Sequence, residues 1–555
     1  METNQNKAFN FFYTATFFGL CLALFPWLGT YWSQAINTDV AYLTLSAEKM
    51  LSGLKMSEAY YDTNLPLSMI VQIPAATLTK VTGIPIYYAS SVYALSLLAL
   101  SLTAVWKLLS YFKELSPEQR FTILGVYLYT NTLLPGYDFG QKDHFLGMAL
   151  FPLVLTQILI TNKTTLPKYL KYSLLAAGSF FILIKPHYGL IPASIFIHRA
   201  ITQRRLNVVF DTDFLWLAGM ALSYIAVLFI FFNDFITIIL PDILTYYASD
   251  ISDKVVATGV ILIVQAIAPL FIAQLFCKKA PGLISAFSFI AALGLIPFIM
   301  QGKGWAYHAL PANMFFYSAI ALLISYGITA GLNTLRKTDA PSSFTRLASF
   351  TLPIMALLFV LVSRYYAASP AHSYTHEEYK STPFAKRIKL CASEYGHSCP
   401  FLMFNGILNI SQELQVYTNE QNATRFPYPW FVPVLLNTQR TLNDGNPSPI
   451  TQTELNAALD KYMKMLAQDF ERHGPKLIFI AHIPNPANRS KLFNTRDFML
   501  TSAPDLFIPI WERYELEESV MVDRLEYMYA KFPDEDLIQY DIYKKKSIEE
   551  EQPQP

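Results

Sequence analysis

Ionisable and aromatic side chains gather in the stretches that separate the apolar segments of this chain. These candidate reactive residues are Asp39, Tyr61, Asp138, Gln141, Asp143, His144, Lys185, His187, Lys303, Trp305, Tyr307 and His308. Two separated carboxylates can divide the work of a group transfer, because one removes a proton from an acceptor hydroxyl while the other orients a partner or a metal. Lysine and histidine near a membrane interface can hold a phosphate. A lipid-linked phosphosugar would place its phosphate at that depth.

Each of these residues also has a purely structural explanation. Asp39 could be a solvated acid or a helix cap, because Thr38-Asp39 precedes a helical run. Lys185 could extend to the interface, and Trp305 and Tyr307 could be aromatics of the interfacial belt. Their convergence favours function, because acids, bases and aromatics are predicted on one face and mostly Lys and Arg on the other. Ionisable groups at membrane depth are functional candidates by default.

The elements that must position these residues are apolar segments long enough to cross a bilayer. Eleven are predicted, at 11–32, 85–110, 120–136, 144–161, 169–185, 187–198, 214–232, 257–276, 281–300, 312–332 and 348–364. The segment 169–198 could instead be one broken hairpin around Lys185-Pro186. Residues 65–82 contain Pro66, Pro74 and Gly83, so we interpret them as interfacial or re-entrant. The first segment is longer than the apolar part of a typical signal peptide, and we expect it to remain as a membrane helix.

The basic residues of the loops predict the orientation. With the N-terminus inside, the inner loops contain most of the Lys and Arg, as the positive-inside rule requires. The residues after the last span then lie outside, in a periplasm or an equivalent lumen. Cys391 and Cys399 lie close together there, and an oxidising compartment would allow a local disulfide between them. Two unrelated thiols are the alternative.

Composition divides the chain into a lipid-embedded part and a water-soluble part. The whole chain is 53% hydrophobic and only 15% charged, but residues after 365 have an ordinary soluble composition. We therefore predict a transmembrane domain at 1–365, a soluble α/β domain at 366–543 and a disordered tail at 544–555. The net charge is +1 and no long basic patch is present, so nucleic acid is not an expected partner.

The soluble part mixes strand and helix signals. Residues 475–482 predict a buried strand, and 453–471 predict an amphipathic helix that begins with a capping box at Thr451 and Glu454. The aromatic stretch 425–430 is typical either of a sugar- or membrane-binding loop or of a proline-rigid surface loop.

The opening of the chain resembles the GT-C superfamily of membrane glycosyltransferases. Asp39 after the first apolar segment, Tyr60-Tyr61-Asp62 and Asn64-Leu65-Pro66-Leu67 are similar to openings in the protein O-mannosyltransferase-like and lipid A aminoarabinose transferase-like branches. An acidic site after the third helix is also typical of these proteins, and Asp138 and Asp143 lie there. The family usually has a Pro-Pro-Leu-like segment, whereas this chain has one proline.

The resemblance implies a reaction and its roles. Asp39 would be the base that acts on the acceptor, and Asp143, rather than Asp138, the second acid. Lys185, Lys303 and His308 would contact the donor phosphate. The donor would be a polyprenyl-phosphate sugar, and the acceptor a glycan, lipid or protein. Some GT-C enzymes use a divalent metal such as Mg²⁺ or Mn²⁺, so the two carboxylates could hold one.

Three other functions fit the same residues. A transporter or flippase of lipid-linked glycans would place polar groups at the bilayer midplane and show internal repeats, neither of which the sequence displays. A ligase or acyltransferase on the same face and a non-catalytic assembly scaffold are the other two. We expect an inner-membrane protein with a cytoplasmic N-terminus and an extracytoplasmic C-terminal domain.

Overall fold

The protein folds as two compact units, seen here in a computed structural model. The structure describes residues 19, 22, 24–247, 253–276, 282–336, 342–368, 375–396, 398–404, 410–484, 492–523 and 537–546. The first unit, called the helical unit, comprises Met1–Ser33, Ser90–Phe231 and Asp250–Pro370. The second, called the sheet-containing unit, comprises Gln34–Ala89, Phe232–Ser249 and Ala371–Pro555. Each unit is described by itself.

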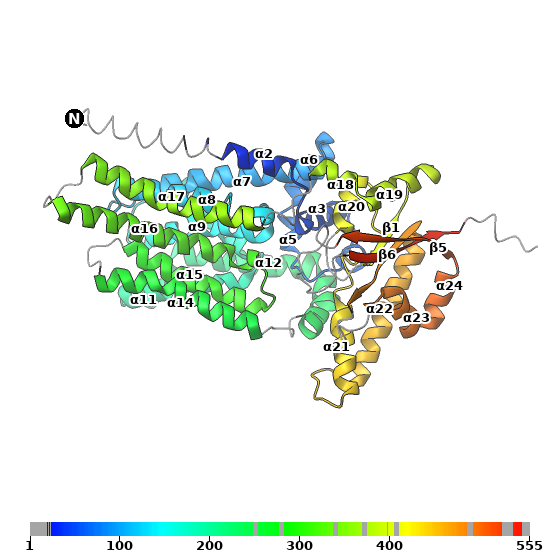
Figure 1. The fold of residues 1–555 in the computed structure, drawn as a ribbon. Coiled ribbons are helices and arrows are strands. Elements are labelled where there is room, and N and C mark those ends of the chain that lie inside the picture. The colour runs from blue at the N-terminus through cyan, green and yellow to red at the C-terminus, as the bar shows by residue number, and fades with distance from the viewer. Residues whose placement is uncertain are drawn as a thin grey trace, which may run out of the picture. The chain divides into compact units, whose positions relative to one another are not determined.

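Long apolar helices dominate the helical unit (Figure 1). They are α7 (Ile86–Leu109), α9 (Lys142–Thr161), α12 (Thr212–Phe231), α14 (Asp253–Phe276), α15 (Gly282–Gln301), α16 (Leu310–Arg336) and α17 (Ser343–Ala368). In the described part of the chain, six segments are long and apolar enough to cross a membrane; five lie in α7, α9, α12, α14 and α15, and the sixth, Ala306–Thr334, begins just before α16. The chain is therefore a multi-pass helical membrane protein with a C-terminal sheet.

Three further helices occupy predicted spans but are short. These are α8 (Pro117–Thr130), α10 (Lys168–Ile182) and α11 (Leu190–Thr202), with 14, 15 and 13 residues. Each is about 20 Å long at 1.5 Å per residue, less than the hydrocarbon thickness of about 30 Å. The predicted count of eleven spans exceeds the number of described helices that meet the length criterion. Of the predicted span 11–32, the structure describes mainly α2 (Phe25–Ser33), and residues 11–18 lie outside the described residues.

Helix α9 lies at the centre of the helical unit. Most of its apolar window is buried, whereas none of the corresponding window of α12 is. The aromatic ring of Phe151 in α9 stacks on Phe315 of α16 at 4.8 Å between centroids, and Phe287 of α15 packs against both. The polar first turn of α9 is therefore held at one end of a closely packed core.

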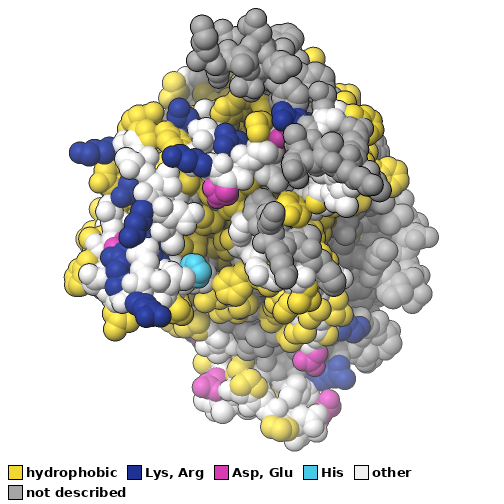
Figure 2. All heavy atoms as spheres, turned by 90° about the vertical axis from the view of Figure 1, so that its left-hand side faces the viewer, with side chains coloured by type: hydrophobic (Ala, Val, Ile, Leu, Met, Phe, Trp, Pro, Cys, Tyr) yellow, Lys and Arg dark blue, Asp and Glu magenta, His cyan; other side chains and the backbone are white. Residues whose placement is uncertain are grey.

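Basic side chains gather on one face of the molecule (Figure 2). The loops that join α9 to α10 and α11 to α12 contain the exposed residues Lys163 and Arg204. Arg199 is buried beside them, with one guanidinium nitrogen 2.7 Å from Asp213 and another 2.8 Å from Asp211. Its charge is thus neutralised within the unit, and the exposed Lys and Arg give this face its positive character.

The C-terminal residues form a four-stranded mixed sheet of order β1-β2-β6-β5. Strand β1 (Phe401–Phe404) is parallel to β2 (Leu477–Ala481), and β6 (Leu537–Lys545) is antiparallel to both β2 and β5 (Tyr514–Asp523). Every residue of β1, at one edge of the sheet, and of β2, inside it, is buried, so both faces of the sheet are covered there. The helices of this region are α18 (His376–Lys380), α19 (Pro383–Glu394), α20 (Ser411–Thr418), α21 (Phe431–Asn443), α22 (Gln452–His473), α23 (Thr495–Ser502) and α24 (Pro504–Trp511).

Several local predictions for this region are confirmed. Helix α22 begins with a reciprocal capping box between Thr451 and Glu454, and strand β2 lies within the predicted range 475–482. Strand β6 extends to Lys545, however, so the expected disordered tail is wrong at its first residues, because they pair with Leu477 in the sheet. Residues 547–555 lie outside the described residues.

The first long loop belongs to the sheet-containing unit. It folds into α3 (Thr38–Leu51), α4 (Met56–Ala59), α5 (Leu67–Ile70) and α6 (Ile73–Thr82). The segment Phe235–Tyr247 joins the same unit as two π-helical stretches around α13 (Leu240–Asp242). A single boundary at residue 365 therefore does not describe the compact units, since the first loop and residues 232–249 fold with the C-terminal residues.

Two buried carboxylates attach these segments to the C-terminal residues. Asp242 accepts hydrogen bonds from Tyr61, from Tyr462 at 2.8 Å and from Lys461 at 2.8 Å. Asp469 pairs with Arg425 at 2.8 Å, and Arg425 donates in turn to the backbone carbonyl of Ser57 in the first loop at 3.3 Å. Buried charges need such partners to offset their desolvation. Each carboxylate thus joins segments that are far apart in the sequence.

The aromatic stretch 425–430 is buried rather than exposed. Phe426 and Trp430 are 2% and 3% exposed, and both rings contact Tyr61 of the first loop. The stretch is therefore part of the packing between the first loop and the C-terminal residues. Neither a sugar-binding loop nor a surface loop describes it.

Candidate functional site

The central feature of the helical unit is a buried ion pair between Asp143 and Lys185. Their side chains meet at 2.8 Å, and Asp143 is fully buried while Lys185 is 9% exposed. Asp143 lies in the first turn of α9, where the positive end of the helix dipole favours a carboxylate. Lys185 follows the end of α10, just before the short helix η2 (Pro186–Gly189). The two charges therefore lie where helices begin or end: Asp143 in the first turn of α9 and Lys185 in the turn after α10.

A second lysine shares an aromatic neighbour with Lys185. The ammonium groups of Lys142 and Lys185 each lie 5.7 Å from the ring centre of Tyr307. Lys185 also donates a hydrogen bond to the Gln301 side chain at 2.5 Å. Two lysines and one aspartate therefore lie around Tyr307 in a buried setting, and cationic groups of this kind can bind an anion.

Several polar atoms around this pair have no hydrogen-bond partner in the described part of the chain. They include Oδ2 of Asp143, Nε2 of His187 and Nδ1 of His308. The His308 backbone carbonyl accepts a hydrogen bond from Tyr188 at 2.6 Å, which holds that turn in place. Lys142, Lys185 and His187 lie near enough to His308 to act on it electrostatically. Buried polar atoms without partners are costly, so their concentration here indicates a place for a ligand.

The other predicted residues of the helical unit lie in turns or stabilise them by hydrogen bonds. The Gln141 side chain donates to Asp138 at 2.9 Å, and Nδ1 of His144 accepts from the Gly140 backbone at 3.1 Å. These bonds shape the turn before α9. Lys303 is half-buried and Trp305 is 43% exposed in the turn before Tyr307. In this unit the structure brings Asp143, Lys185, His187, Tyr307 and His308 together and adds Lys142 and Gln301, which the sequence analysis did not select.

Asp39 lies in the sheet-containing unit, in the first turn of α3. Asn37 caps this helix by accepting hydrogen bonds from the backbone of Asp39 and Val40. The preceding residue, Thr38, donates a hydrogen bond to Glu413 of α20. Asn37 and Glu413 therefore both stabilise the helix start that contains Asp39.

Glu413 is a functional candidate that sequence reasoning missed. It is 3% exposed, and burial raises its pKa to about 7. The nearby Asp39 adds to this rise in pKa, whereas hydrogen bonds with Thr38 and with the backbone of Glu413 and Ile410 oppose it. No local sequence signal distinguishes Glu413 from a solvated glutamate, because its environment comes from a helix 375 residues away in the chain.

Tyr61, predicted to bind substrate, has a structural environment instead. Its side chain is fully buried, its hydroxyl donates to Asp242 and its ring packs on Phe426 and Trp430. These contacts leave it no exposed surface for a substrate. Asp62 beside it is also buried and accepts from Asn64 at 2.6 Å.

The described residues contain one further cavity of ligand size within the sheet-containing unit, of about 500 Å³. Its walls include Leu45 and Glu48 of α3 and Gln415 and Tyr417 of α20. Small-molecule sites have volumes in this range. No group of three or more His, Cys, Asp or Glu side chains within the described ranges lies close enough to hold a metal ion.

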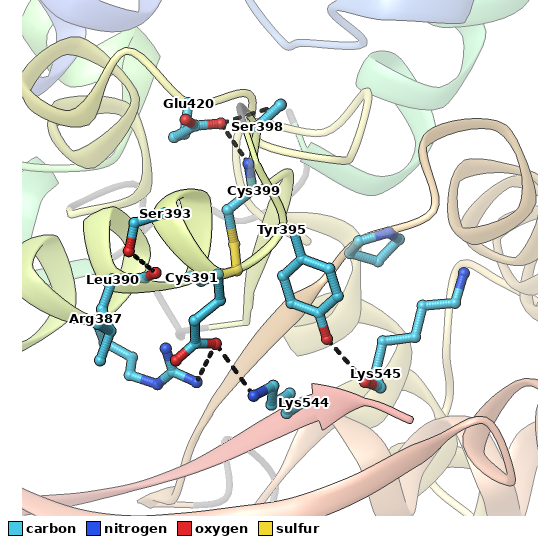
Figure 3. The surroundings of a disulfide bond; sticks show 12 residues. Arg387, Leu390, Cys391, Ser393, Tyr395, Ser398, Cys399, Glu420, Lys544 and Lys545 are labelled. Atoms are coloured by element: carbon cyan, nitrogen blue, oxygen red, sulfur yellow. Dashed lines mark hydrogen bonds and ion pairs between the residues drawn. A yellow bond between two sulfur atoms is a disulfide. The ribbon is translucent and has the colours of Figure 1, made fainter. Parts of the chain in front are cut away.

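The structure joins Cys391 and Cys399 by a disulfide (Figure 3). Both cysteines are fully buried, and the bond ties the end of α19 to the residues before β1. The adjacent backbone is held by Glu420, which accepts from the Cys399 N–H at 2.7 Å. The pairing is the one that the spacing of the two cysteines suggested.

No protein-family model matches the sequence, and no curated protein matches it. Among solved structures, the chain is similar to the crystal structure of ArnT from Cupriavidus metallidurans bound to undecaprenyl phosphate. That similarity has 11% sequence identity and a TM-score of 0.44, and it covers 96% of this chain and 98% of the other. The apo structure of the same protein is similar to the same degree, over 95% and 97% of the two chains. A similarity of this extent assigns no residue's role in this chain.

Proposed function

We propose that this chain is an integral membrane glycosyltransferase that transfers a sugar from a polyprenyl-phosphate donor to an acceptor. The observation that carries the proposal is the buried group of Asp143, Lys185 and Lys142 around Tyr307. Cationic groups at the ends of apolar helices suit the phosphate of a lipid-linked donor, which supports the proposal. The resemblance of the first loop to GT-C enzymes supports the same function.

In the proposed reaction, Asp39 accepts the proton of the acceptor hydroxyl. The acceptor oxygen forms a bond to the anomeric carbon, and the bond between that carbon and the phosphate oxygen breaks. The electron pair of the broken bond remains on the polyprenyl phosphate. Lys185 and Lys142 would stabilise this leaving group, so a strong general acid is not needed. A single displacement of this kind inverts the anomeric configuration.

Asp143 would orient Lys185 rather than react itself. Its carboxylate fixes the ammonium group, and the fixed ammonium can then meet the phosphate without reorganisation. His187 and His308 have nitrogens without described partners, so they are further candidates for contacts with the donor.

We further propose that the reaction takes place on the extracytoplasmic side of the inner membrane. The basic face of Figure 2 would lie in the cytoplasm, in keeping with the positive-inside rule. The disulfide between Cys391 and Cys399 fits an oxidising compartment for residues 366–543. Cysteine labelling of engineered single-cysteine loops in intact cells tests this orientation.

The function is tested with the purified full chain in lipid nanodiscs. A panel of radiolabelled polyprenyl-phosphate sugars is incubated with glycan, lipid and peptide acceptors, with and without a chelator of divalent metals. We expect transfer from one donor class and no transfer by the Asp39→Asn variant. The matched control is Asp444→Asn, because Asp444 is about half exposed and its ion pair with Arg440 is an exposed contact.

The alternatives give different results in the same experiment. A transporter or flippase would move the labelled lipid across the bilayer without forming a glycosylated product. A scaffold would do neither. Transfer that persists fully in Asp39→Asn would exclude Asp39 as the base.

A further inference from the structure

Helix α20 of the C-terminal residues packs directly on α3 of the first loop. The contact includes the hydrogen bond from Thr38 to Glu413 and a second one from the Ile36 backbone to the Tyr417 hydroxyl at 2.8 Å. Both bonds reach the start of α3, next to Asp39. A helix contributed by the C-terminal residues therefore fixes the position of the candidate base.

The residue that precedes α20 has an unusual backbone conformation. Ile410, just before the helix, has a φ of 75°, a left-handed conformation that is uncommon for a β-branched residue. Such a conformation persists only where the surrounding contacts determine it. Oε2 of Glu413 is buried and has no hydrogen-bond partner in the described residues, although Oε1 meets Thr38.

A second carboxylate acts on Glu413. Asp39 on α3 raises the pKa of Glu413, although less than burial does. From the α18 side, His376 lies 2.8 Å from the Tyr417 hydroxyl. An ionised Glu413 would therefore be a buried negative charge close to a second negative charge.

We propose that Glu413 is a positioning residue that acts as a neutral acid: it holds the first turn of α3 through Thr38 and keeps a second negative charge away from Asp39. This inference rests on the proposed function, in which Asp39 is the base. Burial already favours the protonated form of Glu413, since its pKa is raised to about 7. The C-terminal residues would thus set the protonation state around the candidate base and would do more than bind partners.

Ionisation of Glu413 has a definite consequence for catalysis. Two carboxylate charges at the start of α3 repel each other, and this repulsion displaces Asp39 from the position in which it meets the acceptor. Turnover by the wild-type chain should therefore fall as the pH rises through about 7.

The test compares Glu413→Gln with Glu413→Ala in the full chain. Glutamine keeps the size and the hydrogen-bonding capacity of the neutral acid but cannot ionise, whereas alanine removes both. The matched control is Glu420→Gln, a buried glutamate of the same unit that accepts from the Cys399 backbone.

The first measurement needs no substrate. Infrared difference spectra between pH 5.5 and pH 8.5 should show the carbonyl stretch of a buried protonated carboxyl in the wild type and in Glu420→Gln. That band should be absent in Glu413→Gln. A wild-type spectrum without the band, or a band that persists in Glu413→Gln, would overturn the inference even if the chain is a glycosyltransferase.

The second measurement uses the donor and acceptor that the panel above identifies. The fall of kcat/KM above pH 7 should be present in the wild type and in Glu420→Gln and should disappear in Glu413→Gln. Glu413→Ala should lose at least tenfold at every pH. If Glu413→Gln keeps the wild-type pH profile at a reduced rate, its role is only structural and the proposal is wrong. Failure of the proposed function would instead appear as full activity in Asp39→Asn.

Discussion

Replacement of Lys185 by Met is the sharpest test of the buried ion pair. The change keeps the long apolar stem and removes the ammonium group, so Asp143 remains fully buried without its described cation. Removal of one partner from a buried ion pair costs about 3–5 kcal/mol of stability. The double variant Lys185→Met with Asp143→Asn removes both charges of this ion pair. It should recover about 1–3 kcal/mol of that loss.

Reversible unfolding in mixed detergent micelles measures these differences as a double-mutant cycle. The control is Lys168→Met, an exposed lysine at the start of α10 in the same unit, with an expected effect within about 0.5 kcal/mol. A loss in the double variant equal to the sum of the losses in Lys185→Met and Asp143→Asn would show that the two residues are energetically independent. The reasoning about an orienting role of Asp143 would then fail.

The same single variant makes a prediction about binding. A hydrogen bond to a charged group contributes about 1.5–3 kcal/mol, so loss of the Lys185 ammonium should weaken binding of polyprenyl phosphate about 10- to 150-fold. Native mass spectrometry or a fluorescence titration of the purified chain measures this affinity. Undiminished affinity would remove Lys185 from the proposed donor site.

Three further predictions concern the sheet-containing unit. Reduction of the disulfide shown in Figure 3 should lower stability by about 2–3 kcal/mol, because it closes a short loop, and the effect should vanish in a variant without the two cysteines. Arg425→Met should lower stability by about 3–5 kcal/mol, because it leaves Asp469 buried without its cation. Limited proteolysis should then cut the first loop. Arg440→Met breaks an exposed ion pair, so it should change neither the stability nor the proteolysis pattern. The folded-state pKa of Glu413 lies above its unfolded value of 4.5, so its contribution to stability is present below pH 4.5 and is lost as the pH rises through about 7. That loss should be about 3 kcal/mol in the wild type and absent in Glu413→Gln, and pH-dependent unfolding curves of the two chains measure it.

Local patterns in the sequence were sufficient for the elements themselves. The run of apolar residues fixed the helices α7, α9, α12, α14, α15 and α16, since a bilayer-length apolar stretch has few other stable conformations. The Thr451 and Glu454 capping box likewise marked the start of α22, because its hydrogen bonds involve residues only three positions apart. The disulfide between Cys391 and Cys399 could likewise be suggested from the sequence, because the two cysteines are only 8 positions apart.

Helix length and packing were harder to predict from the sequence. Helices α8, α10 and α11 were predicted as spans, but turns shorten them, and the turns depend on contacts with other helices. The aromatic stretch 425–430 carries the composition of an exposed loop and is nevertheless buried, because Tyr61 of the first loop packs over it. A sequence contains no direct record of what covers a given segment.

The sequence by itself determined that this is a multi-pass membrane protein with a C-terminal α/β domain, and it selected Asp39, Asp143 and Lys185 as candidates. It could do so because bilayer insertion and helix capping depend on neighbours within a few turns of chain. Only the tertiary structure decided that Lys185 meets Asp143, that Tyr61 is a packing residue and that Glu413 stands beside Asp39. These outcomes depend on burial and on Coulomb interactions at a few ångströms, and such distances between residues far apart in the chain are set by the fold.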